Sequence, residues 1–344
     1  MTDKSKERGS VLIFAVWSIG LLSVFTVVIG RIAGSELMFG NWVKNRIILR
    51  GLTNAGIERT QFEIESDKFA AFDALNEGWA SNKDAFKNRP LGEAGQFSVE
   101  CRENDSLDPE KPPRYGACDE SARVNLNHAN EETLKNLFKA VDLSLSDAKA
   151  TELAEAIVDW RDGDDAAMTQ GAEASYYKAL PDPYEPRNGP LASVQELLMV
   201  RGIDEKIFKK VKPYITVYSR GPVNFNTAGL VVLQALGLSP ELAGRVMEYR
   251  RGPDNKEGTE DDRIFQSADS ITAALSAAMS FSSEEYAQIS NAVGLGIVGV
   301  QATAFRIHSI GRLIKDGKVV ESGEDSVTCV VNRKGQILYW QEGE

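Results

Sequence analysis

Two acidic segments carry the residues of this chain with the clearest capacity for chemistry. The first reads DWRDGDDAAMTQGAEASYY and the second reads GPDNKEGTEDD. Carboxylates this close in one loop repel each other unless a cation joins them. Oxygen ligands at short spacing with intervening glycines suit calcium better than zinc, although neither segment has the EF-hand register. We expect bound calcium, with solvated acidic turns as the alternative. The expected ligands are Asp159, Asp162, Asp164, Asp165, Glu173, Asp254, Glu257, Glu260, Asp261 and Asp262.

The sequence offers little for catalysis. It has no Gly-x-Ser-x-Gly elbow, phosphate-binding loop or dinucleotide fingerprint. Its two histidines, His128 and His308, lie far apart, which argues against acid–base catalysis by histidine. Paired carboxylates for glycoside chemistry stay open as an alternative, on the weak basis of the acidic loops. We expect a protein that is not an enzyme.

The three cysteines are too few for a disulfide scaffold and show no CxxC spacing. Cys101 and Cys118 flank a proline-rich segment, so a disulfide between them is expected if this region is periplasmic. Two alternatives stay open: Cys329 pairs with one of them, or all three are buried thiols.

The elements that position these residues begin with a long apolar segment. Residues 10–30 carry no charge and follow the basic residues Lys4, Lys6 and Arg8. A helix of that length spans about one bilayer core, and the basic residues place its start on the cytoplasmic side. The alternatives are a secretory signal peptide or a plain signal anchor. Amphipathic spacing continues, so we predict one helix over residues 10–66, with a bend near Gly51 and Gly56.

An internal repeat organises the centre of the chain. VNLNHANEETLKNL begins at Val124, and VNFNTAGLVVLQAL begins at Val223. Two further pairs, IVDWRDG with VMEYRRG and ASVQELL with DSITAAL, follow in the same order, which a chance match would not produce. We expect the side chains of Asn127 and Asn226 to cap the helices that follow.

The remaining pattern indicates an α+β protein. Helices are predicted over residues 69–86, 131–141, 148–161, 193–201, 230–236, 240–250 and 270–279. Strands are predicted over 95–101, 303–314, 318–322, 326–332 and 336–341, with a loop over 105–116. The strands therefore enclose a mostly helical insertion.

The helical repeats resemble helix-hairpin-helix (SAM-like) units of competence DNA receptors. Such hairpins hold DNA phosphates on the backbone of a Gly-x-Gly turn, which this sequence lacks. Residues 125–294 contain 26 acidic and 17 basic side chains, within a protein of formal net charge −11. We therefore expect protein docking and no nucleic-acid partner.

The N-terminus resembles that of the type IV prepilins. In that family a short basic leader ends in glycine, and a membrane peptidase cuts before the apolar helix. The resemblance implies cleavage between Gly9 and Ser10, followed by N-methylation. Pilins usually carry glutamate at the fifth mature position, whereas this chain has Phe14. Absence of that glutamate is a feature of the K minor pseudopilins of type II secretion.

Together, these features resemble the family of K minor pseudopilins, also called general secretion pathway protein K. The resemblance implies a transmembrane helix, a pilin-like α/β head and a large inserted α-domain with calcium in its acidic loops. It implies an inner-membrane anchor, a periplasmic head and a place at the pseudopilus tip, where the protein helps to initiate assembly and limits filament length. The implied partners are the I and J minor pseudopilins, the major pseudopilin, the prepilin peptidase and the inner-membrane secretion machinery. The alternative is a minor pilin of type IV pili or DNA uptake.

The same resemblance divides the chain into segments. They are the leader (1–9), the pilin helix (10–66), the first part of the head (67–122), the inserted domain (123–298, with repeats 123–220 and 221–298) and the C-terminal strands (299–344).

Overall fold

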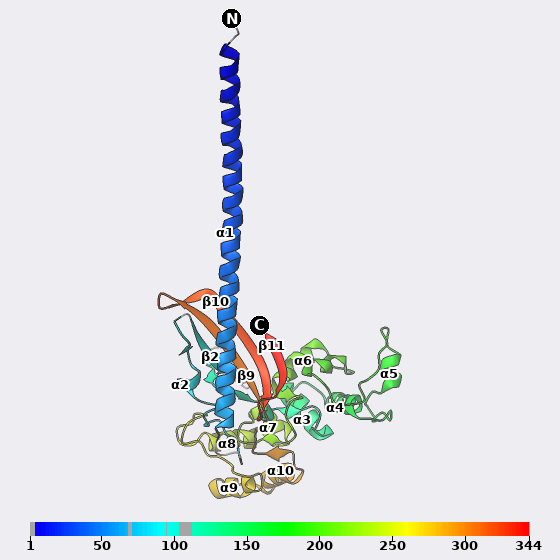
Figure 1. Cartoon of the computed structure of the whole chain (residues 1–344). Helices are drawn as coiled ribbons and strands as arrows, with labels where there is room; N and C mark the ends of the chain where they lie inside the picture. The colour runs from blue at the N-terminus through cyan, green and yellow to red at the C-terminus, as the bar shows by residue number, and fades with distance from the viewer. Residues whose placement is uncertain (1–3, 68–70, 94, 103–111, 344) are drawn as a thin grey trace.

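The computed structural model describes residues 4–67, 71–93, 95–102 and 112–343. A long helix, α1, runs out of a compact head, and a helical insertion lies on the head at the end far from the N-terminus (Figure 1). The helices are α1 (Lys4–Glu65), α2 (Lys83–Phe86), α3 (Glu131–Val141), α4 (Asp147–Arg161), α5 (Ala174–Lys178), α6 (Glu205–Val211), α7 (Leu230–Ala235), α8 (Pro240–Arg250), α9 (Ser270–Ala278) and α10 (Ser283–Gly294). Three 3-10 turns add η1 (Glu120–Ala122), η2 (Val194–Met199) and η3 (Lys212–Tyr214).

The mixed α and β content agrees with the predicted fold class. The strands are β1 (Arg89–Pro90), β2 (Gly95–Cys101), β3 (Arg114–Tyr115), β4 (Cys118–Asp119), β5 (Val124–Asn125), β6 (Ile215–Thr216), β7 (Val223–Asn224), β8 (Val298–Gly299), β9 (Ala304–Lys315), β10 (Lys318–Asn332) and β11 (Ile337–Glu342).

Helix α1 is apolar and exposed along its first half. Among the described residues it is the helix that is long and apolar enough to cross a membrane, with a mean hydropathy of 2.5 over its best window. Side chains such as Phe14, 75% exposed, and Leu37, 70% exposed, contact little of the protein. The second half packs on the head instead, where Leu52 and Ile64 are buried. One helix therefore combines an exposed apolar segment with a segment that supports the head.

The head is an antiparallel sheet against which α1 packs. Its strand order is β1-β2-β9-β10-β11, with β3 beside β2 and β4 beside β9. The β9–β10 hairpin turns at Asp316 and Gly317, which both have positive φ, as a tight two-residue hairpin requires. Gly56 brings α1 close to β9, because a Cβ there would lie 2.2 Å from Ser309 Oγ.

The buried apolar residues form two clusters. One lies in the head between α1 and the sheet and includes Leu52, Trp79 and Phe305. The other fills the insertion and extends from Val124 to Val300. The chain enters the insertion after β4 and returns directly into β9, so two paired strands of the head hold both ends of the insertion.

Three secondary-structure predictions are wrong. In place of a helix over 69–86, the described residues contain only α2, because the backbone is committed elsewhere: Asp73 N–H donates to Val300 O, and Trp79 O accepts from Ala117 N–H. Residues 193–201 form the 3-10 turn η2 rather than an α-helix. The strands predicted over 318–322 and 326–332 form one strand, β10. The predicted interruption between them coincides with an irregularity in the pairing of β10 with β9, between Val319 and Glu324, and the strand continues through it. Most of the predicted loop 105–116 lies outside the described residues, and Arg114–Tyr115 forms β3.

Candidate metal centre and its framework

Each copy of the VNxN motif starts with a short parallel strand pair. Strand β5 pairs with β6, and β7 pairs with β8. In both copies the first asparagine accepts a hydrogen bond from the backbone N–H two residues ahead: Asn127 N–H donates to Asn125 Oδ1, and Asn226 N–H donates to Asn224 Oδ1. The two copies therefore share one local structure.

The second asparagine of each motif fixes a distant segment rather than a helix end. The side-chain amide of Asn127 forms two hydrogen bonds with the backbone of Leu191: Asn127 Nδ2 donates to Leu191 O at 3.0 Å, and Leu191 N–H donates to Asn127 Oδ1 at 2.7 Å. Asn226 makes the same pair of bonds with Phe265, at 2.9 and 2.8 Å. The predicted capping role is wrong, because Asn130 caps α3, and α7 follows Gly229 with no side-chain cap.

An arginine completes each copy. Arg161 donates to the carbonyls of Leu126 and Ala129 at the end of α4. Arg250, at the end of α8, donates to the carbonyls of Phe225 and Ala228. These bonds hold the C-terminal end of each helix, from which the chain continues into the acidic loop, against its own VNxN motif.

The first acidic loop folds back on α4 and gathers three carboxylates. Oxygen atoms of Asp159, Asp162 and Glu173 all lie within 4.8 Å of one another. Asp159 and Glu173 are buried, with 0% and 2% of their surface exposed. Gly171 makes this approach possible, because a Cβ there would lie 2.0 Å from Asp159 Oδ2.

This cluster lacks a positive partner among the described residues. None of the three carboxylates forms an ion pair with a described side chain. Asp162 Oδ1 and both oxygens of Glu173 are buried without a hydrogen bond of normal geometry. Burial, with the neighbouring negative charges, raises the pKa of Asp159 and Asp162 and raises the pKa of Glu173 to about 7. Three converging carboxylate oxygens fit a calcium ion, which takes several oxygen ligands at 2.3–2.6 Å.

The other predicted ligands of this loop point elsewhere. Asp164 Oδ1 accepts from Ala166 N–H, and Asp165 Oδ1 accepts from Asn188 Nδ2. Gly171, whose small size admits Asp159, was not among the predicted site residues. Its position inside the acidic segment was the available signal.

The second acidic loop is arranged differently. Glu257 pairs with Arg250 and Arg251, and Asp262 accepts from Gly258 N–H. Asp261 accepts from Asp254 N–H, and Asp254 accepts from Lys256 N–H. Glu260 is exposed. Within the described residues, these carboxylates do not form a group of three that could share an ion.

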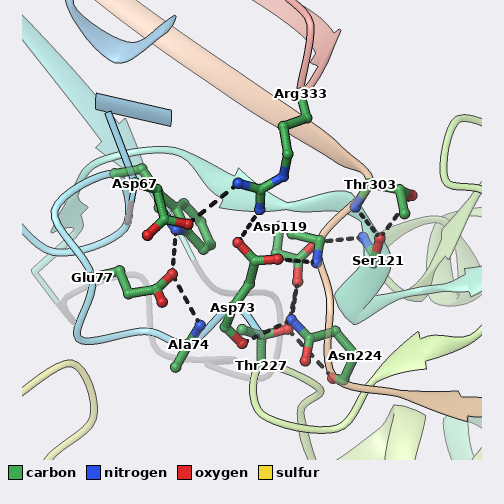
Figure 2. Close-up of polar contacts among 12 residues, drawn as sticks. Asp67, Asp73, Ala74, Glu77, Asp119, Ser121, Asn224, Thr227, Thr303 and Arg333 are labelled. Carbon is green, nitrogen blue, oxygen red and sulfur yellow. Dashed lines mark hydrogen bonds and ion pairs between the residues drawn. The ribbon is translucent and has the colours of Figure 1, made fainter. Parts of the chain in front are cut away.

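A further carboxylate cluster joins the head to the insertion, and no sequence pattern pointed to it. Asp67, Asp73 and Glu77 lie close together below Arg333 (Figure 2). Arg333 pairs with both aspartates, and Asp73 Oδ2 also accepts from Ala302 N–H at 2.7 Å. The protein supplies its own cation here, in contrast to the first acidic loop.

The same joint contains a buried aspartate on β4. Asp119 is 4% exposed and accepts from Asn224 Nδ2 at 2.8 Å and from Thr227 Oγ1 at 2.7 Å (Figure 2). Burial raises the pKa of Asp119 to about 7. Asn224, the first asparagine of the second VNxN copy, thus connects the repeat to the head.

The remaining predicted site residues are the cysteines and the processing site. Cys101 and Cys118 form a disulfide, and Cys329 is a free, buried thiol. Gly9 and Ser10 lie within α1.

Comparison with known proteins gives one family in each case. Residues 117–220 match the family described as type II secretion system (T2SS), protein K. The chain is 32% identical over 106 residues to the type II secretion system protein K of Pectobacterium carotovorum subsp. carotovorum, which covers 31% of this chain and 30% of that protein. It is 36% identical over 95 residues to the protein K of Aeromonas hydrophila, which covers 26% of this chain and 29% of that protein. The aligned segments thus span about 30% of the length of these relatives.

The fold has a match over almost the whole chain. One subunit in the crystal structure of the GspK-GspI-GspJ complex from enterotoxigenic Escherichia coli aligns with a TM-score of 0.57 and 20% identity. The alignment covers 91% of this chain and 98% of that subunit. The matched domain, the relatives and the common fold agree with the resemblance found in the sequence: residues 117–220 are similar to protein K of type II secretion systems, and the fold of the chain is similar to that of a subunit of the GspK-GspI-GspJ complex.

Proposed function

We propose that this protein caps the tip of the periplasmic pseudopilus, helps to initiate its assembly and limits its length. The position of the insertion carries this proposal. Helices α8, α9 and α10 lie beyond the C-terminal end of α1, at the end of the head opposite the N-terminus (Figure 1). In a filament whose N-terminal helices point towards the membrane, this bulk covers the surface on which another subunit would stack.

The fifth position of the processed protein supports the same placement. In pilin-type filaments the glutamate found there is thought to neutralise the N-terminal amine of the neighbouring subunit. A subunit with nothing above it meets no such amine, and an unpaired carboxylate in hydrocarbon costs several kcal/mol. Phe14 avoids that cost. Cleavage between Gly9 and Ser10 by a prepilin peptidase, followed by N-methylation, belongs to this proposal.

The proposed partners are the I and J minor pseudopilins, on the basis of the solved complex with the same fold. The major pseudopilin and the inner-membrane secretion machinery complete the assembly. α1 is the inner-membrane anchor, and the head and insertion face the periplasm, where the Cys101–Cys118 disulfide is stable. The role is structural rather than enzymatic.

Co-purification tests this assembly. The full-length protein, extracted in detergent, is expected to retain both partners when the three proteins are produced together. The control is the same protein lacking residues 123–298. Co-purification of the major pseudopilin with this variant checks that the variant is correctly inserted in the membrane. The proposal is contradicted if the full-length protein is purified without either partner although both partners are present in the same membranes.

We further propose that calcium binds Asp159, Asp162 and Glu173. The buried, unpartnered oxygens of Asp162 and Glu173 are the observation that favours a bound cation over a solvated turn. A ligand that binds only the folded protein raises its melting temperature by mass action. Melting in calcium and in chelator should therefore differ for the native protein and for Asp261→Asn, but not for Asp162→Asn. Superimposable curves for the native protein contradict calcium binding.

A further inference from the structure

A cavity of about 360 Å³ opens between the head and the insertion, separate from both carboxylate clusters. Strand β4 and turn η1 line it from the head, and α7 and α8 line it from the insertion. The first acidic loop contributes no residue to it. Neither the calcium proposal nor the tip proposal assigns it a role.

The charge of the cavity is opposite to that of the protein. Among the described residues, six arginines and three carboxylates line it, whereas the whole protein has a net charge of −11. Glu257 pairs with two of these arginines, Arg250 and Arg251, and Asp119 accepts from Asn224 and Thr227. The arginines outnumber the carboxylates in this described lining, which suits an anionic ligand.

Arg123 is a lining arginine with an unsatisfied buried nitrogen. It is 9% exposed, and its Nη2 is buried with no hydrogen-bond partner. Its Nη1 lies 3.4 Å from Glu120 Oε1, and the same oxygen lies 3.7 Å from Arg306 Nε. The single buried carboxylate of Glu120 therefore forms ion pairs with both arginines. Burial and the neighbouring Arg306 lower the pKa of Arg123 to about 10, and an anion beside Arg123 would favour its charged form.

The rest of the lining sets the class of ligand. Leu75, Leu230, Val232 and Met247 contribute apolar surface to the same cavity. Its volume lies within the range of organic ligand sites and exceeds the size of a bare oxyanion. A guanidinium binds carboxylates through paired hydrogen bonds. We infer that this cavity binds a peptide carboxylate flanked by an apolar side chain, contributed by a protein partner.

Such a carboxylate has two sources, the C-terminus of a polypeptide or an aspartate side chain. N-acetyl-leucine represents the first, and N-acetyl-Leu-Asp-amide represents the second. N-acetyl-leucinamide is the neutral control, and inorganic phosphate is the bare-oxyanion control. Saturation-transfer NMR on the full-length protein in detergent, at fixed salt, measures each affinity. The inference expects one or both carboxylates to bind at least tenfold more tightly than the amide and than phosphate.

Matched variants place the binding in the cavity. Arg123→Gln should weaken binding of the better carboxylate at least tenfold, and Arg251→Gln, on the opposite wall, should weaken it severalfold. Arg220→Gln, an exposed arginine outside the cavity, should change it less than twofold. Should Arg123→Gln fail to fold, Arg251→Gln decides. Equal binding of the amide, preferential binding of phosphate, no binding, or equal affinities in Arg251→Gln and Arg220→Gln overturns the inference.

Discussion

At the scale of single residues, the two groups of neighbouring carboxylates differ in whether an arginine neutralises them. Arg333 pairs with Asp67 and Asp73 at the joint of head and insertion (Figure 2). Asp159, Asp162 and Glu173 have no such partner among the described residues. Because an unpaired buried charge is costly, the second group needs protons or a cation, and the proposed calcium ion would be that cation.

A glycine tests the geometry of the proposed calcium site. In Gly171→Ala the new Cβ would lie 2.0 Å from Asp159 Oδ2, so the carboxylate must move. We expect the rise of melting temperature in calcium, relative to chelator, to fall by at least half. Gly163→Ala, in the same loop with no atom within 4 Å of its Cβ, is the control and should keep the full rise. The same loss in both variants would contradict the proposed ligand set.

A buried acid makes the joint sensitive to pH. The folded pKa of Asp119, about 7, lies above its ordinary value of 3.8, so the folded protein holds this proton more tightly than the unfolded protein. Its contribution to stability is therefore complete below pH 4 and is lost as the pH rises through 7. The loss amounts to as much as roughly 4 kcal/mol.

Unfolding in chelator between pH 5 and 8 measures this contribution. Asp119→Asn removes the titrating group, so its free energy of unfolding should fall less steeply with pH than that of the native protein. Glu260→Gln, which changes an exposed carboxylate, should keep the native slope. A slope unchanged by Asp119→Asn would show that burial does not raise this pKa.

At the scale of elements, α1 is exposed and apolar in its first half and packs on the head in its second half. The packing of α1 on β9 depends on Gly56, whereas a Cβ added at Gly51 would meet no atom within 4 Å. We expect Gly56→Ala to destabilise the head by about 1–3 kcal/mol through overpacking against Ser309 and Phe97. Gly51→Ala should stabilise it by up to about 1 kcal/mol, because alanine favours helix. Thermal melting in detergent distinguishes them, and equal effects would contradict this close contact.

The sequence predicted the elements whose signals are local. Residues 95–101 alternate in polarity and form β2, and residues 131–141 form α3 as expected. Residues 69–86 have helical spacing, but their described part is helical only at α2. The backbone groups of Asp73 and Trp79 form hydrogen bonds with remote parts of the chain instead. The roles of Asn127 and Asn226 were missed for the same reason, because their partners lie 64 and 39 residues away.

The candidate site was predicted in part. The acidic spacing identified Asp159, Asp162 and Glu173 among ten carboxylates, but the choice of these three depends on how the loop folds back at Gly171. The cluster of Asp67, Asp73 and Glu77 needs Arg333, more than 250 residues away, and spacing along the sequence holds no signal for it.

At the scale of the whole molecule, the protein has two ends with different tasks. α1 extends from the head as an exposed apolar helix, and the insertion covers the opposite end (Figure 1). In the proposed role, the helix packs into the filament below it, and the insertion covers the surface on which a further subunit would stack. The proposal therefore implies one copy at the distal end.

Locating this protein on assembled pseudopili tests that claim most directly. Pseudopili containing an epitope-tagged, full-length copy are labelled with gold, and the tagged major pseudopilin serves as the shaft control. The account predicts about one label per filament, at one end. Labels distributed along the shaft would contradict it.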